Sequence, residues 1–143
     1  MPSLSETASP VAPALVYLDT SALVKLVVNE PESDALAHWL DDTPDSMLVT
    51  SVIGRVELVR ACRRHSDQAA VAAVALLAEF ALVPMDATVL EIASTVGPET
   101  LRTLDALHLA SAIGLRSRLQ AFVAYDVRLV AAADHARLPV VAP

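Results

Sequence analysis

Four acidic residues at the ends of apolar segments, or within them, are the side chains best suited to chemistry in this sequence. Asp19 closes the segment ALVYLD and Asp126 closes AFVAYD, whereas Glu57 and Asp105 interrupt the helical patterns RVELVRAC and LRTLDALHLASA. A carboxylate in such surroundings costs free energy unless a cation or hydrogen bonds compensate it. Oxygen ligands suit Mg²⁺ or Mn²⁺ better than zinc or copper. If the four residues converge in the fold, they predict a site for a hard metal ion that can cleave phosphodiesters.

These acidic residues also have purely structural interpretations. Asp19 precedes the segment TSA, which starts a predicted helix, so it could be the N-cap of that helix. Asp105 falls near the start of another predicted helix, where the helix dipole favours an acid. Asp126 could belong to a turn. The pattern of the residues alone leaves both interpretations open.

Three arginines lie close to these acids in the sequence. Arg60 and Arg64 share nearly the same predicted helix face as Glu57, because each helical residue turns the chain by about 100°. They form either a phosphate-binding edge or an exposed basic surface, on which Glu57 would pair with an arginine. Arg102 precedes Asp105 by three residues and is either a phosphate contact or a partner that screens the acidic cluster.

The four histidines and the single cysteine form no metal-binding pattern. His108 lies one helical turn beyond Asp105 and could touch the site, but we interpret it as a residue of the core. His38, His65 and His135 are expected near the surface. Cys62 is expected to pack on an apolar helix face, and one cysteine excludes an internal disulfide.

Short β-branched runs alternate with longer runs rich in Ala and Leu. Strands separated by helices predict an α/β fold, with a central parallel sheet of about five strands covered by helices on both faces. The site of such a fold lies outside the carboxyl ends of the strands, where Asp19 and Asp126 would fall. Pro31 is expected in the first turn of a helix and Asp86 at a helix N-cap. The predicted strands are 15–18, 48–50, 81–83, 121–124 and 140–141, and the predicted helices are 21–28, 32–40, 52–64, 68–80, 87–96, 104–115 and 128–133.

Composition limits the class of protein. A chain of 143 residues suits one domain, and we expect a flexible extension at residues 1–13 followed by a single domain at 14–143. With 55% hydrophobic but only 3% aromatic residues, the core must consist mainly of Ala, Val and Leu. No signal peptide is evident, and the longest apolar stretch, residues 69–85, is too short to span a membrane, which needs about 20 apolar residues. We therefore expect a cytoplasmic protein with no membrane partner.

The net charge of −7 makes the protein a poor non-specific binder of polyanions. It does not exclude a nucleic-acid substrate, because a bound cation would neutralise part of the acidic cluster.

Four segments together resemble the PIN-domain family and, more narrowly, the VapC-type toxins of bacterial toxin–antitoxin pairs. They are VYLDTSALVKL, GRVELVRA, LDALHLASA and FVAYDVRLVAAA, and the resemblance covers the chain from Val16 to Pro143. It implies a three-layer sandwich and a metal-dependent endoribonuclease that uses Mg²⁺ or Mn²⁺. In this hypothesis water attacks the scissile phosphorus, and no side chain acts as the nucleophile.

The resemblance also assigns roles to residues. Asp19, Glu57 and Asp105 match the three central acidic positions of the family and Asp126 matches the more variable fourth, so all four are candidate catalytic residues and metal ligands. Thr20 and Ser21 match the hydroxyl-bearing positions that follow the first acid. Ala124 is a departure, because many relatives carry Thr there, and its missing hydroxyl weakens the expected support of Asp126.

Partners follow from the resemblance as well. It implies an RNA substrate, a VapB-like antitoxin, and a homodimer or a higher hetero-oligomer with the antitoxin, so that the toxin inhibits translation and growth. Two alternatives remain: an inert PIN-like module that binds RNA or protein, and a housekeeping RNA-processing nuclease. A phosphoacceptor receiver domain lacks its paired acids and its Lys here, and a haloacid-dehalogenase-like phosphatase would need Asp where Ser21 stands.

Overall fold

The structure is a computed structural model that describes residues 12–143. The extension predicted for residues 1–13 lies almost wholly outside the described residues and stays a prediction. The strands are β1 (Leu15–Leu18), β2 (Met47–Ser51), β3 (Ala81–Val83), β4 (Leu119–Val123) and β5 (Val140–Val141). The helices are α1 (Thr20–Lys25), α2 (Ser33–Asp41), α3 (Val52–His65), α4 (Asp67–Leu77), α5 (Ala87–Thr95), α6 (Thr103–Ile113) and α7 (Val127–His135).

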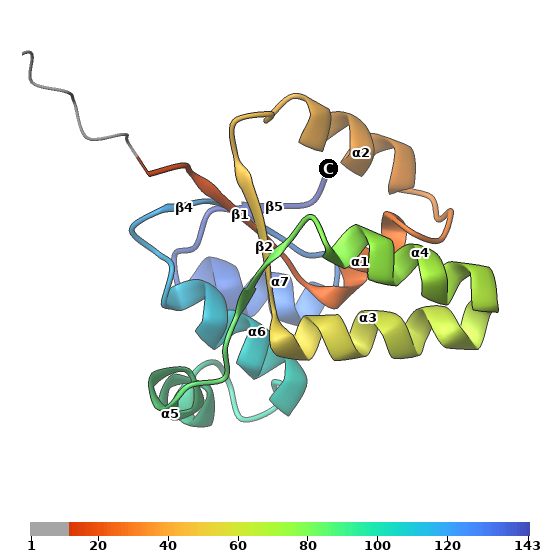
Figure 1. The fold of residues 1–143 in the computed structure, drawn as a ribbon. Coiled ribbons are helices and arrows are strands. Elements are labelled where there is room, and N and C mark those ends of the chain that lie inside the picture. Colours follow the sequence, from red (N-terminus) through yellow and green to blue (C-terminus); the bar gives the residue numbers. More distant parts are fainter. Residues whose placement is uncertain (1–11) are drawn as a thin grey trace, which may run out of the picture.

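The five strands form one parallel sheet in the order β3-β2-β1-β4-β5. β1 is therefore central, with β2 on one side and β4 on the other (Figure 1). The chain first builds the sheet outward from β1 to β3 and then crosses to the other side of β1. The point between β1 and β4, where the direction reverses, is the position at which parallel sheets open a crevice for a ligand.

Alternation along β1 separates two hydrophobic layers. Val16 and Leu18 belong to a core that includes residues of α1, α2, α3 and α4, whereas Leu15 and Tyr17 belong to a second core with residues of α6 and α7. Successive strand residues point to opposite faces, so each face of the sheet needs its own helical cover. The predicted three-layer α/β sandwich is confirmed.

Side chains at the helix starts explain where several helices begin. Asp19, Ser51, Ser66, Asp86 and Asp126 each accept a hydrogen bond from a backbone N–H of the helix that follows. Such N-caps satisfy the donors that the first turn leaves unpaired. The prediction for Asp86 is thus confirmed.

The boundaries differ from the prediction by a few residues. The predicted place of Pro31 in a first turn is wrong, because α2 begins at Ser33 with Glu32 at its N-cap. The side chain of Ser33 accepts a hydrogen bond from the Glu30 N–H and donates one to the Val28 carbonyl, which holds residues 28–33 in a turn. Within residues 12–143, no helix is both long and apolar enough to cross a membrane.

Candidate functional site

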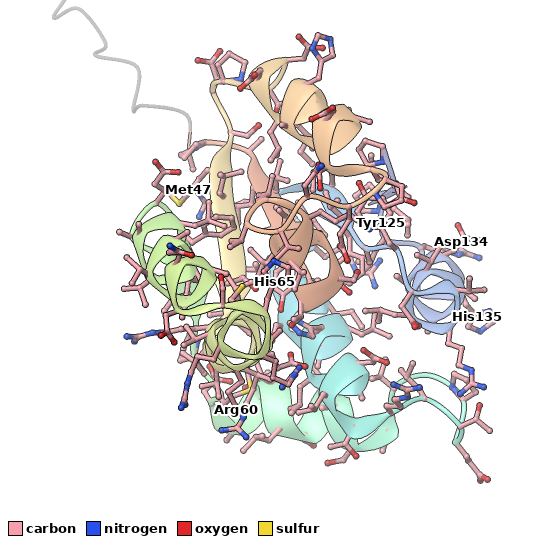
Figure 2. All side chains as sticks on the ribbon, turned by 90° about the vertical axis from the view of Figure 1, so that its right-hand side faces the viewer. Met47, Arg60, His65, Tyr125, Asp134 and His135 are labelled. Atoms are coloured by element: carbon pink, nitrogen blue, oxygen red, sulfur yellow. The ribbon has the colours of Figure 1, made fainter. Side chains whose placement is uncertain are left out.

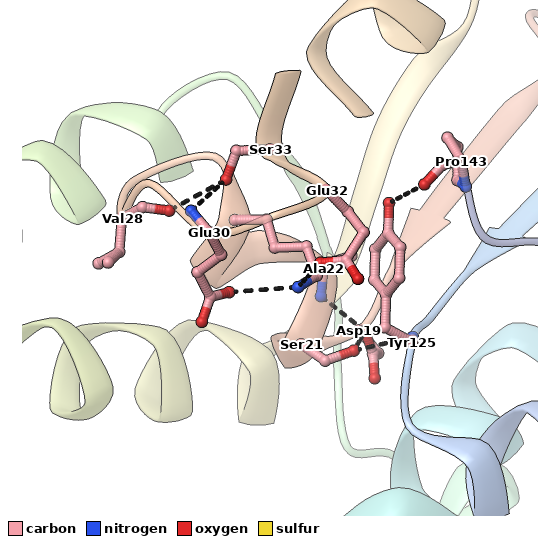
Figure 3. A network of polar contacts seen from close by, with 10 residues as sticks. Asp19, Ser21, Ala22, Val28, Glu30, Glu32, Ser33, Tyr125 and Pro143 are labelled. Carbon is pink, nitrogen blue, oxygen red and sulfur yellow. Dashed lines mark hydrogen bonds and ion pairs between the residues drawn. The ribbon is translucent and has the colours of Figure 1, made fainter. Parts of the chain in front are cut away.

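Asp19 directly follows β1 and is almost fully buried, with 3% of its surface exposed. Its Oδ1 accepts hydrogen bonds from the Ala22 N–H at 2.9 Å and from the Ser21 hydroxyl at 2.7 Å (Figure 3). The capping interpretation of Asp19 is therefore correct. It accounts for only one oxygen, however, because none of the described residues donates a hydrogen bond to Oδ2. Capping of α1 thus leaves half of the carboxylate available to a ligand.

Ser21 connects Asp19 to the loop that carries Asp126. The Ser21 hydroxyl donates to Asp19 and accepts a hydrogen bond from the Tyr125 N–H at 3.0 Å. Lys25 packs its ammonium 4.7 Å from the centre of the Tyr125 ring and pairs with Glu32 at 2.7 Å. These contacts fix the segment after β4 against the segment after β1, so the two acids share one edge of the sheet.

Glu57 lies in the second turn of α3 and is held by residues from two other helices. Its Oε1 accepts hydrogen bonds from the Thr20 hydroxyl at 2.8 Å and from His108 Nε2 at 2.7 Å. Glu57 makes no ion pair with an arginine among residues 12–143, although Arg60 and Arg64 lie on the same helix. The exposed ion-pair interpretation of Glu57 therefore does not describe the folded chain.

His108 is a functional candidate for which the sequence favoured a place in the core over a contact with the site. It is buried as expected, with 1% exposed, but both its ring nitrogens are hydrogen-bonded. Nε2 contacts Glu57, and Nδ1 contacts the Tyr17 hydroxyl at 2.7 Å. The signal in the sequence was its position one helical turn after Asp105, which puts both residues near one side of α6.

Gly54 makes the approach of α6 to α3 possible. A Cβ atom at this position would clash with Thr50 Oγ1 and would lie 3.1 Å from Cε1 of His108. A residue without a side chain is therefore needed here for the histidine to reach Glu57.

Asp105 is half-buried in the first turn of α6. Burial raises the pKa of Asp105, the charge of Asp126 raises it further, and His108 and Arg102 oppose these effects. Arg102 thus screens the acidic cluster, in line with one of its two interpretations. The electrostatic influence of Asp126 and Glu57 on Asp105 indicates that three elements bring these acids together.

Asp126 is exposed and caps α7 through Oδ1, which accepts hydrogen bonds from the N–H groups of Arg128 at 3.1 Å and Leu129 at 3.0 Å. As with Asp19, no hydrogen bond from the described part of the chain reaches the second oxygen. Ala124 is fully buried in the core, so backbone donors rather than a neighbouring hydroxyl hold Asp126. The turn-like role of Asp126 and a role in the site are compatible.

The pKa values of Asp19 and Glu57 shift in opposite directions. Burial raises the pKa of Asp19 to about 6, and this effect outweighs the opposing influence of His108, Ser21 and Ala22. Burial also disfavours ionisation of Glu57, but the hydrogen bonds that it accepts from His108 and from the Thr20 hydroxyl outweigh this effect and lower the pKa of Glu57. Neighbouring acids whose environments shift their pKa values in opposite directions are typical of functional sites.

A groove of about 380 Å³ joins Glu57 to the basic face of α3. Thr20, Glu57, Arg60, Arg64 and Leu104 are among its lining residues. Figure 2 shows Arg60 and His65 on α3, across the view from Asp134 and His135 at the end of α7. The structure therefore brings the two predicted phosphate contacts of α3 to the side of Glu57. His65 and His135 are exposed, as predicted.

Metal binding must be judged from the donor set. Within residues 12–143, no three His, Cys, Asp or Glu side chains lie close enough to hold an ion by themselves. Mg²⁺ commonly binds one or two carboxylates and keeps several water ligands, so a wider ring of acids suits it. The oxygens left without protein donors on Asp19, Glu57 and Asp126 fit such partly hydrated binding.

Comparisons with known proteins agree with this architecture. The model of the PIN domain family matches residues 16–135. A protein named Ribonuclease VapC35, from Mycobacterium tuberculosis (strain CDC 1551 / Oshkosh), is 45% identical over 131 residues, which are 90% of this chain and 97% of that protein.

Solved structures share the fold. The crystal structure of VapC20 from Mycobacterium tuberculosis, described as a sarcin-ricin loop cleaving toxin, has a TM-score of 0.70 and 20% identity, and covers 90% of this chain and 99% of that one. A structure of VapBC2 from Rickettsia felis, bound to a DNA fragment from their promoter, has a TM-score of 0.68 and 14% identity, and covers 90% and 98%.

Proposed function

Because the chain belongs to the PIN domain family, we propose that it is a Mg²⁺- or Mn²⁺-dependent endoribonuclease, the toxin of a toxin–antitoxin pair. One observation carries the proposal. At the carboxyl edge of the sheet, Asp19, Glu57 and Asp126 each use one oxygen for hydrogen bonds within the protein, and the second oxygen receives none from the described residues. Asp86 also leaves one oxygen free, but the proposed site acids differ from it because they influence one another: Asp126 and Glu57 act on Asp105, and Asp105 acts on Asp19.

The chain's own residues have distinct tasks in this proposal. Asp19, Glu57, Asp105 and Asp126 hold the metal ion, directly or through water. When bound, Mg²⁺ or Mn²⁺ would supply Lewis-acid polarisation of the phosphoryl oxygens and charge neutralisation. Ser21 fixes Asp19 and Thr20 fixes Glu57, so that the free oxygens keep their places.

Basic residues then position the substrate. Arg60 and Arg64 line the groove beside Glu57 and are suited to contact RNA phosphates. Arg102 is exposed and acts electrostatically on Asp105, so it is suited to the same role beside that acid. A cation and three arginines together would offset the repulsion between a chain with a net charge of −7 and a polyanion.

A partner chain is part of the proposal. An antitoxin would bind the toxin, and this assignment is supported by the solved structure of VapBC-5 from Mycobacterium tuberculosis, which has a TM-score of 0.60 and is described as a member of the VapBC family of toxin–antitoxin systems. Exposed apolar residues offer surface for it or for a homodimer, because Val56, Val71 and Val74 on α3 and α4 expose 54%, 71% and 57% of their surface. A groove of about 720 Å³ between these helices has Val56 and Val74 in its lining. We place the activity in the cytoplasm, where it would inhibit translation and growth.

Cleavage of RNA by the purified protein is the direct test. We expect cleavage with Mg²⁺ or Mn²⁺, none in EDTA, and a loss of at least about 100-fold in Asp19→Asn, which keeps the cap of α1. Asp86→Asn is the matched control, because Asp86 caps α5 with the same kind of bond. Undiminished cleavage in EDTA would refute the metal dependence.

Two further measurements separate the alternatives. An inert PIN-like module would bind RNA without cleaving it at any metal concentration. A housekeeping nuclease would cleave RNA, but its expression would not arrest growth. We expect growth arrest on induction that a co-expressed antitoxin relieves, and mapping of RNA ends after brief induction would identify the target.

A further inference from the structure

Glu57 could pair with an arginine of its own helix, α3, or with side chains of other helices, and it bonds to the latter. A glutamate three residues before an arginine on a helix commonly pairs with it. Here Oε1 instead accepts two hydrogen bonds from outside the helix, from Thr20 and His108. Both donors come from elements that are distant in the sequence, α1 and α6.

His108 is well suited to bind Glu57 in place of Arg60 because the imidazole is itself held by other residues. An ionised carboxylate can only accept hydrogen bonds, so Nε2 carries the proton, and Nδ1 is left to accept from the Tyr17 hydroxyl. The Tyr17 ring stacks on Phe122 at 5.5 Å between centroids and meets the His108 ring edge-on at 5.8 Å. Both His108 and Tyr17 are buried in the core, so the imidazole has little rotational freedom.

We propose that His108 is a positioning residue for Glu57, which acts through the chain Tyr17–His108–Glu57 to keep this carboxylate away from Arg60 and ready to bind the metal ion. The proposal rests on the proposed function, because it assumes that Glu57 binds metal. His108 is not a ligand, since Glu57 and Tyr17 already occupy its two nitrogens. Groups behind a metal ligand commonly orient it, and their loss lowers metal affinity about 10- to 100-fold.

This role has a consequence for the arginines as well. If Glu57 turned toward α3, it would neutralise Arg60 and lose its place beside Thr20. Glu57 and Arg60 line the same groove. By keeping them apart, His108 leaves Glu57 available for the metal ion and Arg60 available for a phosphate.

Mn²⁺ affinity, measured by isothermal titration calorimetry on the purified full chain, tests the proposal without any need for RNA. His108→Leu removes the donor and is expected to weaken Mn²⁺ binding about 10- to 100-fold. His108→Gln carries an amide N–H that can replace Nε2, and it is expected to bind within about threefold of the wild type. Tyr17→Phe keeps the ring stacking but removes the hydroxyl, so an intermediate loss is expected. His38→Leu is the control, because the His38 side chain is 82% exposed.

Urea unfolding in EDTA accompanies each titration, so that a change in stability is not mistaken for a change in positioning. A His108→Leu protein that is less stable but binds Mn²⁺ as tightly as the wild type overturns the proposal and shows a structural role only. A folded His108→Gln protein that binds as weakly as His108→Leu overturns it as well. If His108→Leu does not fold, the Mn²⁺ affinities of His108→Gln and Tyr17→Phe decide whether the proposal holds. Wild-type protein that binds no Mn²⁺ would instead overturn the proposed function, and the positioning role with it.

Discussion

Asp19→Asn is expected to stabilise the metal-free protein while it removes the activity. Asp19 is buried, and its Oδ1 caps α1 through the Ala22 N–H. Asn caps helices about as well as Asp, so the substitution keeps the cap and removes the charge. A buried charge lowers the free energy of unfolding, so the folded protein becomes more stable when that charge is removed.

The magnitude follows from the pKa of Asp19. Burial raises this pKa from the ordinary value of 3.8 to about 6, which corresponds to a cost of about 3 kcal/mol. The folded chain holds the proton to a higher pH than the unfolded chain does. Wild-type stability therefore falls as the pH rises from 3.8 through about 6, and the full cost is present above that range.

Asp19→Asn lacks this pH-dependent cost. The gain should be near zero at pH 4 and should approach about 1–3 kcal/mol at pH 7.5, where the lower figure allows for an amide nitrogen that finds no acceptor.

Urea unfolding in EDTA between pH 4 and pH 8, followed by circular dichroism, measures this difference. Asp86→Asn, which alters an exposed cap of the same type, should stay within about 0.5 kcal/mol of the wild type at every pH. Added Mn²⁺ should raise the unfolding midpoint of the wild type but not that of Asp19→Asn, because only a folded state that binds the ion gains from it. The reasoning would be refuted if Asp19→Asn were no more stable than the wild type at pH 7.5, or if the difference in their unfolding free energies did not change with pH.

Three other substitutions have expected outcomes. Glu57→Gln should destabilise the metal-free protein by about 1 kcal/mol at pH 7.5. The pKa of Glu57 is lowered, so its contribution is present above the ordinary value of 4.5 and should disappear as urea unfolding is repeated below it. Gly54→Ala should cost about 2 kcal/mol or more of unfolding free energy, while Gly114→Ala, whose Cβ would meet only ordinary contacts at 3.5 Å, should cost nothing measurable. Arg60→Ala should weaken RNA binding in Ca²⁺ and reduce its salt dependence by about one ion, whereas Arg118→Ala, at the start of β4 and the opposite edge of the sheet, should leave both unchanged.

Local patterns predicted most of the fold. The alternation of β-branched and Ala-rich runs identified all five strands to within two residues at each end, because a sheet covered on both faces needs apolar strands between amphipathic helices. The same reasoning identified Asp86 as a cap. It failed at Pro31, where a serine hydroxyl bonded on both sides of the turn delays the start of α2.

The candidate site was predictable in its acids but not in their partners. Asp19, Glu57 and Asp126 stood out because they interrupt or end apolar runs. The role of His108 did not, because periodicity reports burial and says nothing about a hydrogen bond to a residue 51 positions away. The local rule that pairs Glu57 with Arg60 was misleading for the same reason, since it takes no account of α6.

The order of the strands also decides when the proposed nuclease becomes competent during synthesis. β1 leaves the ribosome first, yet one of its two neighbours is β4, and Val16 pairs with Ala121 more than a hundred residues later. Asp105 and Asp126 likewise come from the last third of the chain. A nascent or truncated chain that stops before β4 contains Asp19, Glu57 and Asp105 but lacks both Asp126 and the crevice between β1 and β4. The proposed nuclease therefore becomes competent only after β4 and Asp126 have been synthesised and β4 has paired with β1.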